Sequence, residues 1–262
     1  MYSILSSQQV EAVTHFLGKC VVPIFDGSRA TPRVEGTGFF VDLYRQPYLV
    51  SAGHVIQRSQ PELLSVPTKP EGPQVQTLGQ GTAITNNDTE RLDVGVYRLE
   101  NAQVISQLRK SWTFLSRDFL PRDELLNSFL VAGYPESQTK VDGHKISSRP
   151  IQQIYTTVYD GPTDETPDPY DLFLKYSDQA TATGERLIKT PKLHGVSGAP
   201  VWGIRTLDPS SVWAPEKALA LVGVEFAFAH KKYIRCKSWQ VVQALISRTR
   251  RFKRRRTRKR ST

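Results

Sequence analysis

The sequence predicts an all-β protein built from two antiparallel β-barrels, with a short helix at the N-terminus and another near the C-terminus. Short runs rich in β-branched and aromatic residues are broken by Gly, Pro and Asn along most of the 262 residues, which is typical of strands joined by tight turns. These runs form two sets, separated by a charged connector at residues 101–127. No helical patterns alternate with the strands, and this favours closed antiparallel sheets over a parallel α/β sheet.

A helix is expected at residues 7–17, ahead of the first strand. Val10, Val13 and Leu17 recur there at helical spacing, after a serine able to cap the first turn. We therefore interpret residues 1–19 as a helical lead-in to the first barrel.

The first barrel is expected over residues 20–115 and the second over residues 116–247. Apolar runs predict strands of the first barrel at residues 20–25, 38–43, 48–51, 75–84 and 94–99. Similar runs predict strands of the second barrel at residues 128–133, 151–159, 172–176, 199–204 and 219–228. The last apolar pattern, at residues 239–246, has helical spacing, so the second barrel is expected to end in a helix.

The overall composition is that of a globular chain, with 39% hydrophobic residues and two cysteines. No stretch approaches the roughly 18 to 20 apolar residues of a membrane span, and the N-terminus lacks the pattern of a secretory signal. We therefore expect a cytoplasmic protein without a membrane span. Cys20 and Cys236 lie far apart in the sequence and are expected to be reduced and buried.

The net charge of +10 comes from the C-terminal segment, residues 248–262. Ten basic and no acidic residues lie between Arg248 and Arg260, and the rest of the chain has 25 basic and 25 acidic residues. Like charges at this density predict a disordered tail. Two interpretations remain open: electrostatic attachment to nucleic acid or another anionic surface, or a basic extension with no specific partner.

Three short motifs carry the chemistry. Ser197 lies between two glycines in Gly195-Val196-Ser197-Gly198-Ala199-Pro200, and glycines flank a nucleophile where the backbone turns sharply and a substrate approaches closely. Two other motifs precede it: Ser51-Ala52-Gly53-His54 and Leu92-Asp93-Val94-Gly95. The order His, Asp, Ser differs from that of α/β-hydrolases and of subtilisins, and it is the order of the chymotrypsin-type double barrel.

Together, these motifs resemble those of the trypsin-like serine peptidases. Ser-Ala-Gly-His is similar to the family's Ala-Ala-His element, the aspartate motif to its Asp-(Ile/Leu)-(Ala/Gly)-(Leu/Val) element, and the serine motif to its Gly-Asp-Ser-Gly-Gly-Pro element. The resemblance spans roughly residues 20–247 and favours a bacterial cytoplasmic type without a PDZ domain.

The resemblance implies a catalytic triad of His54, Asp93 and Ser197. His54 would accept the proton of the Ser197 hydroxyl and return it to the leaving amine, and Asp93 would orient the imidazole. Taken singly, His54 could be a core histidine, Asp93 a turn carboxylate and Ser197 a turn serine. Their order and local sequence together favour the triad.

The resemblance also assigns the oxyanion hole to the backbone N–H groups of Gly195 and Ser197; the structural alternative for Gly195 is a plain turn glycine. Val196 stands where relatives activated by cleavage have an acid that pairs with the new N-terminus. That switch cannot operate here, so the loop should be set by packing, by a partner or by the substrate.

Substrate-binding residues are expected on the stretch before the serine and on a late strand, at Leu193, His194, Val224 and Glu225. If the Glu225 carboxylate faced the pocket floor, it would favour a basic residue before the scissile bond. If it pointed outward, it would be a solvated strand residue. We favour the outward or rim orientation, since a shift of one residue reverses a strand side chain.

The sequence therefore predicts a serine endopeptidase that acts on protein or peptide substrates without a metal or organic cofactor. An activating protein partner and a role as an effector in a bacterial stress or defence system are expected by analogy only. The alternative is a catalytically silent peptidase fold that binds nucleic acid or an anionic surface through residues 248–262. A third hypothesis combines the two, as a peptidase tethered to nucleic acid by the same tail.

Overall fold

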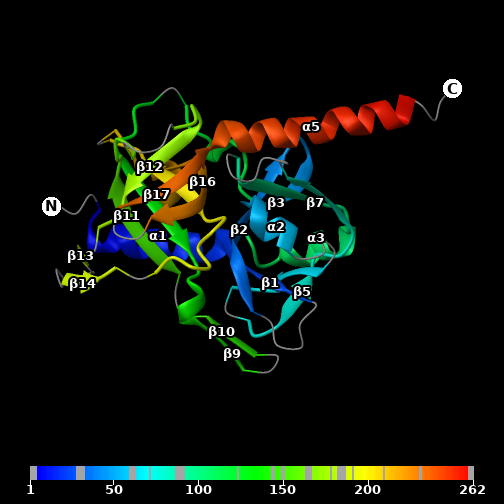
Figure 1. The fold of residues 1–262 in the computed structure, drawn as a ribbon, viewed down its shortest axis with the longest axis horizontal. Helices are drawn as coiled ribbons and strands as arrows, with labels where there is room; N and C mark the ends of the chain where they lie inside the picture. The colour runs from blue at the N-terminus through cyan, green and yellow to red at the C-terminus, as the bar shows by residue number, and fades with distance from the viewer. Residues whose placement is uncertain are drawn as a thin grey trace.

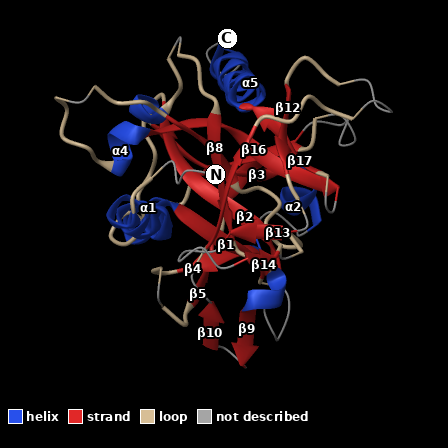
Figure 2. Cartoon of the chain, turned by 90° about the vertical axis from the view of Figure 1, so that its left-hand side faces the viewer, coloured by secondary structure: helices blue, strands red, loops and turns tan. Residues whose placement is uncertain are grey.

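A computed structural model shows the fold of the chain (Figures 1 and 2). It describes residues 5–27, 33–58, 63–70, 72–85, 92–122, 124–142, 145–148, 151–162, 167–177, 179–181, 187–190, 192–208, 210–229 and 232–258. Within these ranges the side chains of residues 138–148, 179–188 and 249–258 lie outside the description.

The first barrel is a curled antiparallel sheet of seven strands in the order β5-β4-β1-β2-β3-β7-β6. The strands are β1 (Val21–Asp26), β2 (Val34–Leu43), β3 (Gln46–Ala52), β4 (Leu64–Pro67), β5 (Val75–Thr77), β6 (Gly81–Thr85) and β7 (Val94–Leu99). The run predicted as one strand at residues 75–84 is two, β5 and β6, with Gly79 between them in a positive-φ conformation (67°). Strand β4 was not predicted.

The second barrel is a six-stranded antiparallel sheet in the order β11-β8-β15-β16-β17-β12. Its strands are β8 (Ser128–Gly133), β11 (Gln152–Thr157), β12 (Asp171–Lys175), β15 (Pro200–Ile204), β16 (Leu219–Ala229) and β17 (Tyr233–Ser238). An antiparallel bridge between Val158 and Leu174 joins the two edges of this sheet, and the backbone N–H of Tyr159 donates to the carbonyl of Phe173 (2.9 Å). The sheet therefore closes on itself, which removes its exposed edges.

Two small hairpins project from the second barrel. They are β9 (Thr139–Asp142) with β10 (Lys145–Ser148), and β13 (Gln179–Thr181) with β14 (Leu187–Lys189). The first hairpin follows the short 3₁₀ helix η3 (Glu136–Gln138) and extends from the lower end of the molecule in Figures 1 and 2.

Helix α1 (Ser7–Cys20) forms where the sequence predicts a helix and is capped by Ser6, in a capping box with Gln9. Its buried side includes Phe16, whose ring stacks on Phe119 of the 3₁₀ helix η2 (Arg117–Phe119) and meets Trp202 of β15 edge to face. The lead-in helix therefore packs against the second barrel although it precedes the first. The other short helices are α2 (Gly53–Arg58), α3 (Ala102–Leu108) and α4 (Pro215–Ala218).

Helix α5 (Trp239–Arg258) begins at the predicted position but continues well past the predicted end at residue 246. Its first part lies against β16 and β17 and then against β6 and β7, so it contacts both barrels, and its far end extends beyond the body (Figure 1). The backbone is helical to Arg258, where the charge of residues 248–262 predicted disorder. Arg and Lys are good helix formers, and the docked first turns supply the costly nucleus from which the helix propagates.

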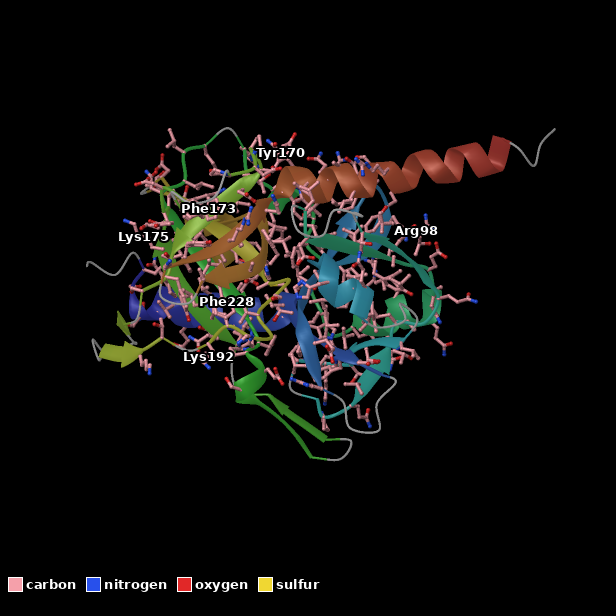
Figure 3. All side chains as sticks on the ribbon, viewed as in Figure 1. Arg98, Tyr170, Phe173, Lys175, Lys192 and Phe228 are labelled. Atoms are coloured by element: carbon pink, nitrogen blue, oxygen red, sulfur yellow. The ribbon has the colours of Figure 1, made fainter. Side chains whose placement is uncertain are left out.

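The two barrels share one hydrophobic core in addition to their own interiors. One cluster of buried side chains joins Phe39 and Val50 of the first barrel to Leu130 and Leu221 of the second. Trp239, at the start of α5, belongs to the same cluster, and its ring centroid lies 6.5 Å from that of Phe39. Figure 3 shows side chains filling the space between the barrels. Such close packing fixes the relative position of the two barrels and so of residues on either side of the cleft.

Both thiols are free and buried, as predicted, and burial is the main reason that the pKa values of Cys20 and Cys236 are raised. Among the helices within the described ranges, none combines the length and hydrophobicity needed to cross a lipid bilayer.

Candidate active site

His54 and Asp93 are brought together by the pairing of two strands. Strand β3 ends at Ala52, whose partner in the antiparallel ladder is Val94 of β7. His54 therefore lies in the first turn of α2, beside Asp93, the residue that precedes β7. A Cβ at Gly53 would lie 2.8 Å from the Asp93 Oδ1 atom, so glycine at this position allows the carboxylate to approach the backbone.

Both oxygens of Asp93 bind His54. Oδ1 accepts the backbone N–H of His54 at 2.7 Å, and Oδ2 lies 2.5 Å from Nδ1 of the ring. The Asp93 side chain is 9% exposed, and that of His54 is 28% exposed. Because a carboxylate only accepts hydrogen bonds, this contact holds the ring proton on Nδ1 and leaves Nε2 as the acceptor.

Ser197 lies at the tip of a tight turn that leads into β15. The two glycines of its motif have positive φ values, 90° at Gly195 and 94° at Gly198. A Cβ at Gly198 would lie 2.1 Å from the carbonyl oxygen of Thr37, and a Cβ at Gly195 would lie 2.6 Å from the backbone nitrogen of Glu136. Both positions therefore require glycine for two reasons, the backbone conformation and the close approach of neighbouring backbone.

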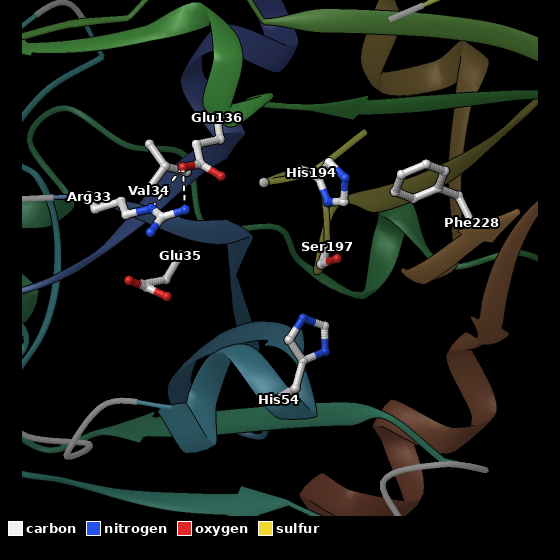
Figure 4. Close-up of a pocket in the computed structure, with 9 residues that line it drawn as sticks. Arg33, Val34, Glu35, His54, Glu136, His194, Ser197 and Phe228 are labelled. Carbon is white, nitrogen blue, oxygen red and sulfur yellow. Dashed lines mark hydrogen bonds and ion pairs between the residues drawn. The ribbon is translucent and has the colours of Figure 1, made fainter. Parts of the chain in front are cut away.

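His54 and Ser197 line one pocket of about 430 Å³ between the barrels. Figure 4 shows the imidazole directed across the pocket toward the serine. The remaining lining residues are Arg33, Val34, Glu35, Glu136, His194, Gly195 and Phe228. The structure gives no hydrogen bond between the His54 and Ser197 side chains, so a proton transfer between them requires a closer approach.

The backbone around Ser197 leaves two donors free. Among the described residues, the N–H groups of Gly195 and Ser197 have no acceptor, whereas those of Val196 and Gly198 donate to the carbonyls of Leu193 (2.9 Å) and Glu225 (2.8 Å). The carbonyl of His194 accepts from the Glu136 N–H at 2.7 Å. In a trans peptide the C=O and the next N–H point in opposite directions, so this bond turns the Gly195 N–H away from Glu136. The result is a pair of unpaired donors beside the serine, as an oxyanion site requires.

Thr37 of β2 ties this loop to the first barrel, and sequence reasoning missed it. Its Oγ1 donates to the carbonyl of Gly195 (2.7 Å) and accepts the N–H of Tyr134 (3.0 Å). Its backbone N–H donates to the carbonyl of Ser197 (2.8 Å), and its own carbonyl accepts from the Ser51 hydroxyl (2.7 Å). The only sequence signal was a hydroxyl residue between two glycines, Gly36 and Gly38, ahead of the apolar run that begins at Phe39.

An ion pair between Arg33 and Glu136 also crosses the cleft. The guanidinium lies 2.6 Å from Oε1 of the carboxylate, and dashed lines mark the contact in Figure 4. Arg33 precedes β2 in the first barrel, and Glu136 begins η3 in the second. Both side chains are more than a third exposed, so the pair adds charge to the pocket and little stability.

Of the predicted substrate-binding residues, only His194 lines the pocket. Its ring meets that of Phe228 edge to face, with centroids 5.5 Å apart, and Phe228 itself was not predicted. Leu193 and Val224 are fully buried in hydrophobic clusters, so they face the interior and not a substrate. The substrate-binding role predicted for the Leu193 and Val224 side chains requires correction, because both side chains pack in the hydrophobic core.

Glu225 also differs from the prediction. It is neither on the pocket floor nor solvated, because its exposed fraction is 0% and neither carboxyl oxygen has a hydrogen-bond partner within the described part of the chain. Burial, together with the negative charge of Asp93, raises the pKa of Glu225 to about 8. A bulge lies between Glu225 and Ala227, where the register with β17 shifts. Such a bulge re-aims side chains, and the simple alternation assumed from the sequence does not apply.

No protein-family model matches the sequence, and no curated protein matches it. The structure is nonetheless similar to solved proteases. The serine protease domain of the Sesbania mosaic virus polyprotein is 14% identical with a TM-score of 0.50, over 86% of this chain and 90% of that one. The active form of the Rv3671c protease from M. tuberculosis is 14% identical with a TM-score of 0.50, over 94% of this chain and 87% of that one.

An inactivated protease paralogue from the scabies mite is similar to the same extent, at 14% identity and a TM-score of 0.51, over 91% of this chain and 96% of that one. Likeness at this level of identity concerns the fold. The two curled antiparallel sheets, their order of strands and these neighbours agree: the chain has the chymotrypsin-like fold of the trypsin-like serine proteases.

Proposed function

We propose that the protein is a serine endopeptidase that hydrolyses peptide bonds through an acyl-enzyme intermediate. The main support is the arrangement of one histidine, whose Nδ1 is 2.5 Å from Asp93 and whose ring faces Ser197 across the pocket (Figure 4). A serine hydroxyl is a poor nucleophile at neutral pH and needs a base held in the correct tautomer.

In the proposed reaction, the Ser197 Oγ attacks the carbonyl carbon of the scissile peptide bond while His54 Nε2 takes the hydroxyl proton. Asp93 stabilises the imidazolium that forms, and the N–H groups of Gly195 and Ser197 donate to the oxyanion. The tetrahedral intermediate collapses as His54 gives its proton to the leaving amine. A water molecule, deprotonated by His54, then attacks the acyl-enzyme. The second tetrahedral intermediate collapses and releases the acid product, while His54 returns the proton to the Ser197 oxygen.

We further propose that packing, and not a buried terminal amine, sets the oxyanion loop. Val196 is 1% exposed and belongs to the core of the second barrel. A Cβ added to Gly133 would lie 2.9 Å from a Val196 methyl group, so this side chain fills its site tightly. With the hydroxyl of Thr37 on the carbonyl of Gly195, the loop has its shape without a cleavage step.

A second candidate function is a catalytically silent binding protein on the same fold. The missing hydrogen bond between His54 and Ser197 favours it, and so does the name of the scabies mite neighbour, an inactivated paralogue. In this case the basic segment after Arg248 would make the working contact, with nucleic acid or another polyanion. Removing residues 249–262 should then abolish salt-sensitive binding to single-stranded DNA, while the docked first turns of α5 remain.

A fluorophosphonate probe distinguishes the two candidates, because it modifies only an activated serine. The wild-type protein should be labelled, Ser197→Ala should not be, and Ser211→Ala, at an exposed serine in a distant loop, should be labelled like the wild type. Absence of labelling in the folded wild-type protein, together with no cleavage of a peptide library, would favour the silent fold.

A further inference from the structure

Glu225 is a buried acid whose backbone is joined to the loop that carries Ser197. Its N–H donates to the carbonyl of Ala199 (2.9 Å), and its carbonyl accepts the N–H of Gly198 (2.8 Å). Its side chain has no exposed surface, and both carboxyl oxygens lack a hydrogen-bond partner within the described ranges. A buried carboxylate without partners is costly, so such a group needs either a proton or a nearby cation.

The ionisable groups that interact with this carboxyl are one acid and one thiol. The negative charge of Asp93, which is itself bound to His54, acts on it from the first barrel. Cys236 is its Cα partner on β17. The described side chains of α5, which packs on β16, include no ionisable group before Arg248, and the neighbouring β15 has none.

The two cationic residues of the neighbouring strand β17 bind another acid. Lys237 follows Cys236 and so points to the opposite face of β17, where its Nζ lies 2.6 Å from Asp171. Arg235 binds the other oxygen of the same aspartate (2.8 Å). Among the described residues, none forms an ion pair with Glu225, and this is why burial and the charge of Asp93 raise its pKa to about 8.

We propose that Glu225 is a positioning residue that carries a proton at neutral pH, leaves Asp93 as the single negative charge behind His54, and inactivates the site when it ionises. The proposal rests on the proposed function, since it concerns the same triad. It also concerns regulation, because it makes catalysis by this site sensitive to alkaline pH.

Movement of the carboxylate connects ionisation to loss of activity. An unpaired charge in the interior would favour a conformation in which Glu225 reaches water. Because its backbone is bonded to Gly198 and Ala199, that movement would displace the loop of Ser197 and its oxyanion donors.

The first test is the pH dependence of the rate of fluorophosphonate labelling. For the wild type, the rate should fall with a midpoint near the pKa of about 8, by about ten-fold one pH unit above it. Glu225→Gln has a similar shape but cannot ionise, so its rate should stay level over the same range. The exposed carboxylate of Glu11 offers a control, and Glu11→Gln should keep the wild-type profile. An alkaline fall that is equal in Glu225→Gln, or absent from the wild type, would overturn the proposal.

The second test needs no substituted protein. Infrared spectra of the wild type at neutral pH should contain the carbonyl stretch of a protonated carboxyl group, although exposed carboxyl groups are ionised there, and the band should disappear with the same midpoint as the labelling rate. Absence of the band at neutral pH would overturn the proposal even if Glu225→Gln did not fold. A wild-type protein that has the band but is not labelled at any pH would instead contradict the proposed function.

Discussion

The hydroxyl of Thr37, on the first barrel, donates to the carbonyl of Gly195, on the second, at 2.7 Å. The same oxygen accepts the N–H of Tyr134, so one buried side chain joins β2, the end of β8 and the loop of Ser197. This bond fixes the orientation of the peptide that follows Gly195. The shape of the loop that carries Ser197 therefore depends on contact between the two barrels as well as on the glycine motif.

Replacing Thr37 with valine should impair catalysis more than stability. The side chain keeps its shape, but the Tyr134 N–H and the Gly195 carbonyl lose their partner, at a cost of about 1–3 kcal/mol for the buried groups. Because the loop is no longer held, we expect kcat to fall by roughly 10- to 100-fold, within the effect of losing an oxyanion donor.

Hydrolysis of a small ester substrate measures this effect, with circular dichroism as a check on folding. Thr37→Ser keeps the hydroxyl and should retain most of the activity. Equal rates for Thr37→Val and the wild type would show that the oxyanion loop holds its shape without the inter-barrel bond.

Replacing Asp93 with asparagine should abolish most of the activity while leaving the substrate pocket in place. The amide can donate to Nδ1, which favours the wrong tautomer of His54 and puts the proton on Nε2. A ring protonated on Nε2 cannot accept the proton of Ser197, so we expect kcat to fall on the order of 10⁴-fold. Asp208→Asn, at an exposed loop position, is a matched control that should retain wild-type rates.

Replacing Gly198 with alanine should prevent the native packing of the Ser197 loop. Its φ of 94° disfavours any side chain, and the added Cβ would lie 2.1 Å from the backbone oxygen of Thr37, which cannot move without disturbing β2. We expect the free energy of unfolding to fall by more than about 3 kcal/mol, since strain and overlap act together.

Gly18→Ala is the control for this substitution. Gly18 lies in α1 with open space around its Cα, so alanine should stabilise the protein by about 0.5–1 kcal/mol. Urea denaturation of the three proteins measures both effects. A Gly198→Ala protein as stable as the wild type would mean that the loop has another conformation.

The stability of the wild type relative to Glu225→Gln should decrease as the pH rises. The carboxyl ionises near its ordinary pKa of 4.5 in the unfolded chain but near 8 in the folded protein. Between these values the folded state binds the extra proton, so the free energy of unfolding falls with pH, by at most about 1.4 kcal/mol per unit. Below the ordinary pKa of 4.5 this contribution to the free energy of unfolding vanishes, and above the folded-state pKa of about 8 it no longer changes with pH.

Urea denaturation across this pH range, with both proteins measured at each pH, gives the difference directly. The contribution from all other groups cancels in the comparison, since the substitution changes one ionisable residue. A difference that does not vary with pH would mean that Glu225 titrates in the folded protein as it does in the unfolded chain.

Much of the fold could be predicted from local patterns. Apolar runs located most strands of both barrels, and helical spacing located α1 and the start of α5, because these signals depend on neighbouring residues. Strand β17 was missed for a physical reason: Arg235 and Lys237 interrupt its apolar pattern, and both are accommodated by the Asp171 carboxylate on β12. That partner lies more than 60 residues away, so no local pattern could reveal it.

The chain by itself determined the two sets of strands, the free thiols and the motifs that contain His54, Asp93 and Ser197, since each is encoded by adjacent residues. The tertiary structure decided which side chains meet. Thr37 became a link between barrels, and Glu225 became a buried acid beside Asp93, because packing of two distant surfaces, and a bulge in β16, set their surroundings. Burial and hydrogen-bond partners depend on residues far apart in sequence, and only folding brings these into contact.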